Sequence, residues 1–188
     1  MKHPYLFCVD DYSNYMHVLK LNSKTHASVW EIMQDIIVWY ASYNWPVMFI
    51  SSDHEAIMGS MRADLAAVKP RIGLELLPTD THEKTAERST RTVRERIRVI
   101  KIDCWYKSPE FLTPWIVEDI TMCQNAVPSR RISHTAIFTV EGRTLNYLTH
   151  LRYPILTVGE FRVPGLPNEQ RSQEERTATG IIVGRNLD

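Results

Sequence analysis

Cysteine is scarce in this sequence, and Cys8, Cys104 and Cys123 lie far apart. An odd number of cysteines, without a Cys-x-x-Cys pair or a His-rich tract, argues against a disulfide scaffold and a zinc site and favours an intracellular protein. Long apolar runs are lacking too, because each is far shorter than the roughly 20 residues that span a bilayer. Asp10 and Asp11 interrupt the apolar N-terminal stretch, which argues against a signal peptide. We therefore expect a soluble protein with no membrane partner.

An excess of charge is also absent, because 22 basic side chains balance 22 acidic ones. Attraction to a polyanion must then come from local clustering. Such a cluster occurs between residues 82 and 101, where seven Lys and Arg stand against three Glu. The 188 residues, 44% of them hydrophobic, suffice for one globular domain with a buried core.

Hydrophobic periodicity predicts strands and helices in the order of an α/β protein. Apolar and alternating stretches predict strands, the first two of them antiparallel, and 3.6-residue spacing predicts helices between them. This order implies a mixed sheet covered by helices. The predicted strands are 5–9, 15–21, 46–51 and 73–78, with two more inside 155–188, and the predicted helices are 25–43, 56–69, 83–101, one from Ser108 to before Pro128, and 134–141.

Two acidic residues stand where chemistry is expected. Asp53 follows the predicted strand 46–51, and sites in open α/β sheets gather outside the carboxyl ends of strands. Glu87 lies in the first turns of the basic helix, with 33 residues between the two. Carboxylate oxygens suit Mg²⁺ or Mn²⁺, and two such ions a few ångströms apart would stabilise a phosphodiester displacement.

The basic helix allows two interpretations. Its arginines could neutralise phosphates in a salt-dependent manner that is largely independent of sequence. Alternatively, the charged face is merely solvated, and Glu87 with Arg91 forms a surface ion pair that contributes a few tenths of a kcal/mol. Composition alone favours the second interpretation.

Four motifs, in this order, resemble the integrase catalytic core of long-terminal-repeat retrotransposons, most closely the copia-like lineage. They are YLFCVDDYSNYMHVLKL, VMFISSDHEAIM, LLPTDTHEKTAERSTRTVRERIR and GEFRVPGLPN with TATGIIVGR, and together they cover nearly the whole chain. The resemblance implies a ribonuclease-H-like fold, a mixed sheet flanked by helices. It also implies an Asp-Asp-Glu triad that holds two metal ions and joins element ends to target DNA.

Carried over by position, the second aspartate matches Asp53 and the glutamate matches Glu87. The resemblance thus gives these two residues both the catalytic and the metal-binding role, with Mg²⁺ or Mn²⁺ as cofactor. Arg91 and Arg94 match basic positions that the family uses against DNA. The predicted DNA-binding residues are Lys84, Arg88, Arg91 and Arg94.

The first aspartate of the family lies on a strand before YLFCVDDYS, and the printed sequence begins after it. Asp10 is not expected to replace it, since it lies on the next strand of the resembling fold. The missing strand would be central, so we expect the strand 5–9 either to pair directly with the strand 46–51 or to leave an open slot beside it.

The sequence thus predicts an N-terminally truncated integrase core over 1–150, followed by a C-terminal β segment over 151–188 that begins the next polyprotein region. The expected protein descends from a Mg²⁺-dependent polynucleotidyl transferase for DNA integration and is inactive because its triad is incomplete. It would be a homo-oligomer, intracellular, and nuclear if functional. The alternatives are a non-catalytic nucleic-acid-binding or interaction remnant, or an incomplete gene model.

Overall fold

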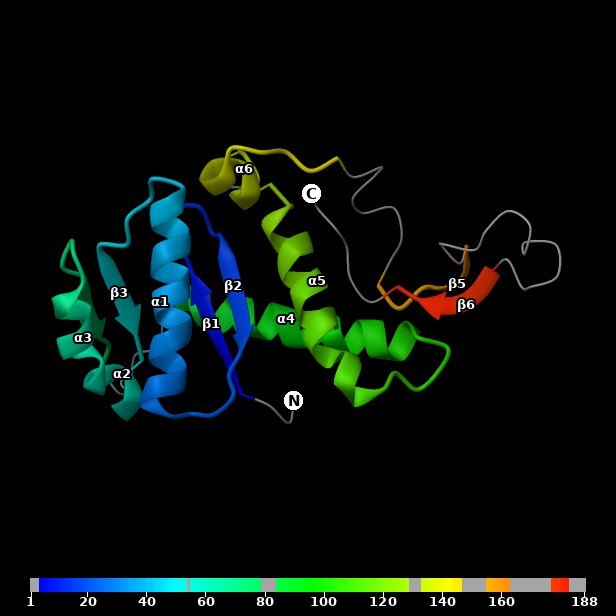
Figure 1. Cartoon of the computed structure of the whole chain (residues 1–188), viewed down its shortest axis with the longest axis horizontal. Helices are drawn as coiled ribbons and strands as arrows, with labels where there is room; N and C mark the ends of the chain where they lie inside the picture. Colours follow the sequence, from blue (N-terminus) through cyan, green and yellow to red (C-terminus); the bar gives the residue numbers. More distant parts are fainter. Residues whose placement is uncertain are drawn as a thin grey trace, which may run out of the picture.

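The computed structural model describes residues 4–53, 55–78, 84–128, 133–146, 155–162 and 177–182 and shows a mixed α/β protein with small sheets (Figure 1). This confirms the predicted α/β class. The strands are β1 (Tyr5–Val9), β2 (Met16–Lys20), β3 (Phe49–Ser52), β4 (Gly73–Leu76), β5 (Val158–Arg162) and β6 (Thr177–Ile181). The helices are α1 (His26–Ser42), α2 (Ala56–Ser60), α3 (Arg62–Ala67), α4 (Lys84–Asp103), the 3₁₀ helix η1 (Glu110–Leu112), α5 (Thr113–Asn125) and α6 (Ala136–Glu141).

The hairpin of β1 and β2 is antiparallel, as predicted, with Tyr5 opposite Lys20. Its turn is closed by the carboxylate of Asp10, which accepts hydrogen bonds from the Ser13 backbone N–H at 2.8 Å and from the Ser13 hydroxyl. Asn14 follows with a φ of 57°, a left-handed conformation that asparagine tolerates better than most residues. The Asp10 side chain therefore serves the turn.

Both faces of this hairpin are covered, because side chains alternate along each strand. On one face, Phe7 and Val9 of β1 and Met16 of β2 pack with residues of α4 and α5. On the other face, Leu6 and Cys8 pack with α1 and with β3 and β4. Figure 1 shows α1 in front of the hairpin and α4 behind it.

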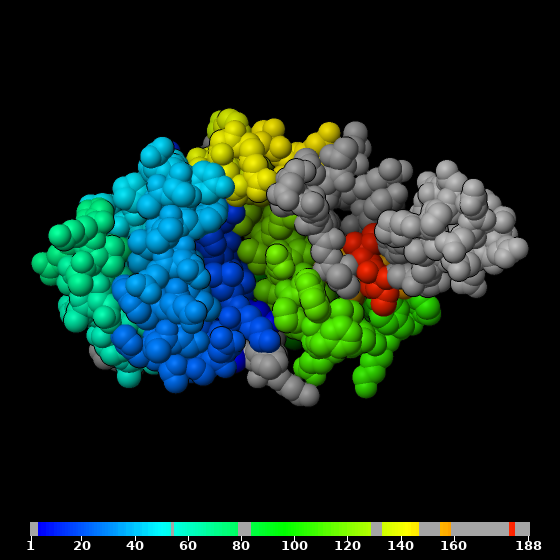
Figure 2. All heavy atoms as spheres, viewed as in Figure 1, coloured from blue at the N-terminus to red at the C-terminus, as the bar shows by residue number. Residues whose placement is uncertain are grey.

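Helix α1 forms where the apolar residues predicted it. Thr25 caps its start, with its side-chain oxygen accepting from the Ser28 N–H. The buried side chains recur at helical spacing and comprise Val29, Met33, Ile36 and Tyr40. In the space-filling view α1 stands as a ridge, and part of the blue N-terminal hairpin is visible between it and the green α5 (Figure 2).

The expected single mixed sheet is wrong for the described residues, which form three separate two-stranded sheets: β1 with β2, β3 with β4, and β5 with β6. Strand β3 pairs in parallel with β4, but β1 does not pair with β3. Of the two outcomes expected there, direct pairing of β1 with β3 is thus wrong for the described strands. All five residues of β1 stay half-buried although both faces of the strand are covered, which agrees with an unpaired edge.

Three predicted elements differ in detail. The predicted strand 46–51 begins only at Phe49, and the predicted helix 56–69 is interrupted at Met61 into two short helices. The helix expected to begin at Pro109 starts with the 3₁₀ turn η1, and the α-helix proper has Pro114 in its first turn. Proline fits either place, because the first N–H groups of a helix have no partner inside it.

The C-terminal β segment is tied to the core. Ile155 and Leu156 are buried in the cluster between the hairpin, α4 and α5, and the Leu156 N–H donates to the Ile182 carbonyl at 2.7 Å. Tyr106 donates its hydroxyl to the Leu156 carbonyl at 3.3 Å. The predicted boundary between 150 and 151 lies outside the described residues, so the division into 1–150 and 151–188 stays a prediction.

Asn125, at the end of α5, should be a major source of stability. Its side chain accepts from the Met16 N–H at 2.8 Å and donates to the Met16 carbonyl at 2.9 Å, and it is only 3% exposed. Asn125→Ala leaves two buried backbone groups of β2 unpaired, so we expect the free energy of unfolding to fall by about 2–4 kcal/mol, measured by urea denaturation. The neighbouring Gln124→Ala is the control, because the Gln124 side-chain oxygen has no hydrogen-bond partner. Equal losses for the two variants would contradict this role.

His17 should make stability depend on pH. Its ring lies between those of Tyr15, Trp39 and Tyr40, and burial lowers its pKa from 6.5 to about 4. The unfolded chain binds the proton already near pH 6.5, so stability falls as the pH drops from about 6.5 to 4, by up to about 3 kcal/mol. In His17→Phe this part of the pH dependence should disappear, which urea denaturation at pH 7 and pH 4.5 would measure. An unchanged slope would show that other groups cause it.

Candidate nucleic-acid interface

Helix α4 carries one buried and one charged face. Val93 and Ile97 are buried against the hairpin and α5. Successive residues of an α-helix are rotated by 100°, so residues near positions 84, 88, 91 and 98 point to the opposite side. The exposed basic side chains of the helix are Lys84, Arg88, Arg91, Arg94 and Arg98, which we call the basic face.

Most cations of the basic face are not neutralised by neighbours. Arg91 forms an ion pair with Glu95 at 3.0 Å, with 80% and 58% of the two side chains exposed. Such a pair contributes about 0.3–0.5 kcal/mol, so Arg91 can exchange it for another anion. In the part of the chain that the structure describes, Lys84, Arg88 and Arg94 form no ion pair. The pair that the sequence suggested between Glu87 and Arg91 is not the one that forms.

Glu87 lies in the first turn of α4 and is exposed. A negative charge is favourable there, because the helix dipole is positive at its N-terminal end, and Lys101 in the last turn complements the other end. Glu87 and Glu95 are the two carboxylates among these cations, so the charge of the helix surface stays positive.

Asp53 directly follows β3, as the sequence predicted, and is half-buried. Its carbonyl accepts from the Glu55 N–H at 2.7 Å, in the tight turn that leads into α2. Across the sheet, the Leu77 N–H donates to the Ser52 carbonyl at 2.9 Å and extends the pairing of β3 with β4 past the strand ends. This pairing fixes the backbone that precedes Asp53.

The carboxylates of Asp53 and Glu87 have the donor chemistry that Mg²⁺ prefers, but the set is incomplete among the described residues. No group of three or more His, Cys, Asp or Glu side chains lies close enough there to hold a metal ion. Asp10 would be the nearest substitute in sequence, yet its carboxylate closes the hairpin turn. A two-metal site needs several shared carboxylates, and the described residues supply fewer than that at one place.

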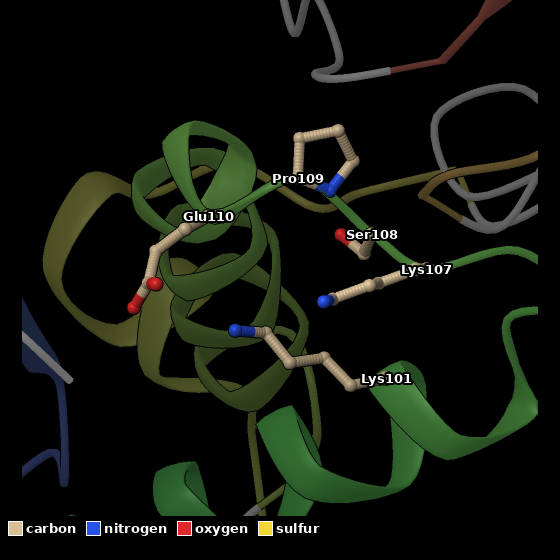
Figure 3. Close-up of a pocket in the computed structure, with 5 residues that line it drawn as sticks. All are labelled: Lys101, Lys107, Ser108, Pro109 and Glu110. Carbon is tan, nitrogen blue, oxygen red and sulfur yellow. The ribbon is translucent and has the colours of Figure 1, made fainter.

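The sequence prediction overlooked a second cationic place, at the connection between α4 and α5. Lys101, Lys107, Ser108, Pro109 and Glu110 line an open depression of about 400 Å³ (Figure 3). Exposed aromatic residues flank it in the sequence, namely Trp105 and Phe111. The alternation of lysine and aromatic residues in KIDCWYKSPEF is the signal that could have indicated it.

Known protein families offer no match to this chain, and no curated protein is similar to it in sequence. The integrase resemblance therefore stays a prediction drawn from the motifs. As for the expectation of no membrane partner, no helix in the described ranges is both long and apolar enough to cross a bilayer.

Proposed function

We propose that this chain is an integrase-type nucleic-acid-binding protein of retroelement origin, with a ribonuclease-H-like ancestry, that holds DNA against the basic face of α4. The observation that supports the proposal most directly is the unneutralised charge of that face. Lys84, Arg88 and Arg94 have no ion pair in the described structure, while Val93 and Ile97 hold the other side of the helix in the core.

The spacing of these cations suits a sugar-phosphate backbone. From Lys84 to Arg98 the helix rises by about 21 Å, at 1.5 Å per residue. One DNA strand carries a phosphate for each 3.4 Å of axis, so a helix lying along the duplex passes about six phosphates. Cations at helical spacing can then neutralise several of them without reading any base.

The integrase part of the proposal rests on the motifs and on two positions. Asp53 lies at the end of the half-exposed parallel strand β3, and Glu87 lies among the cations of the basic face. These are the places where the resemblance puts two of its three carboxylates. Assembly as a homo-oligomer and a nuclear location remain predictions of the same resemblance.

DNA binding should depend on the basic face and on salt. In the double variant R91E/R94E we expect at least a tenfold loss of affinity for a short duplex at 100 mM NaCl, because about two phosphate contacts become repulsive. The slope of log affinity against log salt should become shallower by about two. Fluorescence anisotropy at several salt concentrations measures both.

The matched control is R62E/R71E, which changes the net charge equally at exposed arginines outside α4. Its affinity should fall by much less than that of R91E/R94E. Equal losses in both double variants would show that the total charge, and not the basic face, attracts DNA. An unchanged affinity in R91E/R94E would show that the face is only solvated.

Strand transfer should be absent from the chain as printed. With Mg²⁺ or Mn²⁺ and short DNA ends, we expect no joined product, because two carboxylates poorly replace three in positioning two ions. Gel analysis of labelled ends measures the product. If joined product does form, and Glu87→Gln and Asp53→Asn each abolish it, the chain is a working transferase. The alternative of a protein that only binds nucleic acid would then be wrong.

A further inference from the structure

The depression between α4 and α5 has the chemistry of an anion site. Lys101 projects from the last turns of α4, and Lys107 and Ser108 project from the connection that follows. In Figure 3 both ammonium groups extend into the same space, and the carboxylate of Glu110 lies on the far side of the depression from Lys107 and Ser108. The volume of about 400 Å³ is in the range of pockets that hold small organic ligands.

Two of the polar groups at this place are ready to accept a ligand. Lys107 is exposed and has no ion pair within the described ranges. The Ser108 hydroxyl is shielded from water and has no hydrogen-bond partner there. An unpaired buried hydroxyl is unfavourable, so a ligand oxygen that bonds to it would remove that penalty.

Lys101 is held in place by its neighbours. Its ammonium donates to the Thr113 hydroxyl at 3.2 Å, and Thr113 is buried at the start of α5. This bond uses one of the three protons of the ammonium group and leaves the others available. The depression thus combines one positioned cation, one free cation and one hydroxyl, a donor set that suits the oxygens of a phosphate group.

Two exposed aromatic residues are close in sequence to residues that line the depression. Trp105 is 82% exposed and Phe111 68% exposed, and each is within two residues of a residue that lines the depression. Trp105 is fixed against Tyr106 with ring centres 5.3 Å apart, and Phe111 against Trp115 with ring centres 6.4 Å apart. Rings of this kind stack on nucleobases.

We propose that the depression binds a nucleotide, with its phosphate on Lys101, Lys107 and Ser108 and its base stacked on Trp105. The same chemistry is offered by a free mononucleotide and by one unit of a single-stranded nucleic acid. The cations assigned to this site, Lys101 and Lys107, are different from the five cations of the basic face.

The experiment uses the full chain at 150 mM NaCl with adenosine 5′-monophosphate, adenosine and inorganic phosphate as probes. Quenching of tryptophan fluorescence follows binding to Trp105, and isothermal titration confirms it. We expect adenosine 5′-monophosphate to bind at least tenfold more tightly than either adenosine or phosphate. Equal affinities for the monophosphate and adenosine would overturn the phosphate assignment.

Single substitutions test the residues. Lys107→Gln and Ser108→Ala should each weaken the monophosphate about fivefold or more, and Trp105→Ala should weaken it about tenfold. Lys24→Gln, an equal change at an exposed lysine before α1, should have no effect. If Lys107→Gln and Trp105→Ala both bind like the unaltered chain, the proposal is wrong. Circular dichroism of each variant distinguishes a lost site from a lost fold.

A twelve-residue oligothymidylate identifies the source of the nucleotide. Binding much tighter than that of the monophosphate, and weakened by Lys107→Gln, assigns the site to single-stranded nucleic acid. Binding no tighter than the monophosphate assigns it to a free nucleotide, and both results uphold the site. R91E/R94E should leave monophosphate binding unchanged, so failure of the nucleotide site and failure of the basic face are observed separately.

Discussion

The hairpin of β1 and β2 must be covered on both faces, and the rest of the structure follows from that constraint. Alternating side chains send Leu6 and Cys8 toward α1, and Phe7 and Met16 toward α4 and α5. A two-stranded hairpin is marginal in water by itself, so each layer of helices is needed for its stability. Asn125 adds two hydrogen bonds to this apolar packing, since its side-chain amide bonds to both the N–H and the carbonyl of Met16 at the start of β2.

The need to cover the hairpin also determines the direction in which the basic face of α4 points. Val93 and Ile97 fit the core beneath the hairpin, and their spacing fixes the rotation of α4 about its axis. Arginines that lie half a turn away must then point to solvent, where their desolvation is avoided and their field reaches a polyanion. The packing of α4 and the direction of its charges are therefore linked. A change in the positions of its buried residues would rotate the helix about its axis and move the cations of the basic face.

Local patterns predicted most of this fold. The hairpin, α1 and α4 follow from periods of two and 3.6 residues that extend over whole elements, and Asp53 was placed correctly at the end of a strand. The continuity of the sheet was not predictable, because the pairing of β1 with β3 depends on the separation of segments about 40 residues apart, which no local pattern encodes. The ion-pair partner of Arg91 was not predictable either. Glu87 and Glu95 both lie four residues from Arg91, and side-chain conformation, which the sequence does not show, decides that Arg91 pairs with Glu95. The lining of the proposed nucleotide site lies within residues 101–110, but the sequence does not show that Lys101 is held by Thr113 of α5.

The carboxylates and the cations of the described residues place different demands on geometry. Asp10 is engaged in the hairpin turn, and the described residues hold no cluster of three metal ligands. The cations of the basic face need no such cluster, because long flexible side chains on an exposed helix need only the helix to fold. Affinity for phosphate places weaker demands on geometry than metal-dependent chemistry, since a screened charge acts over several ångströms whereas metal ligands must be placed within a fraction of one. The proposed binding of nucleic acid along α4 therefore does not depend on a complete set of metal ligands.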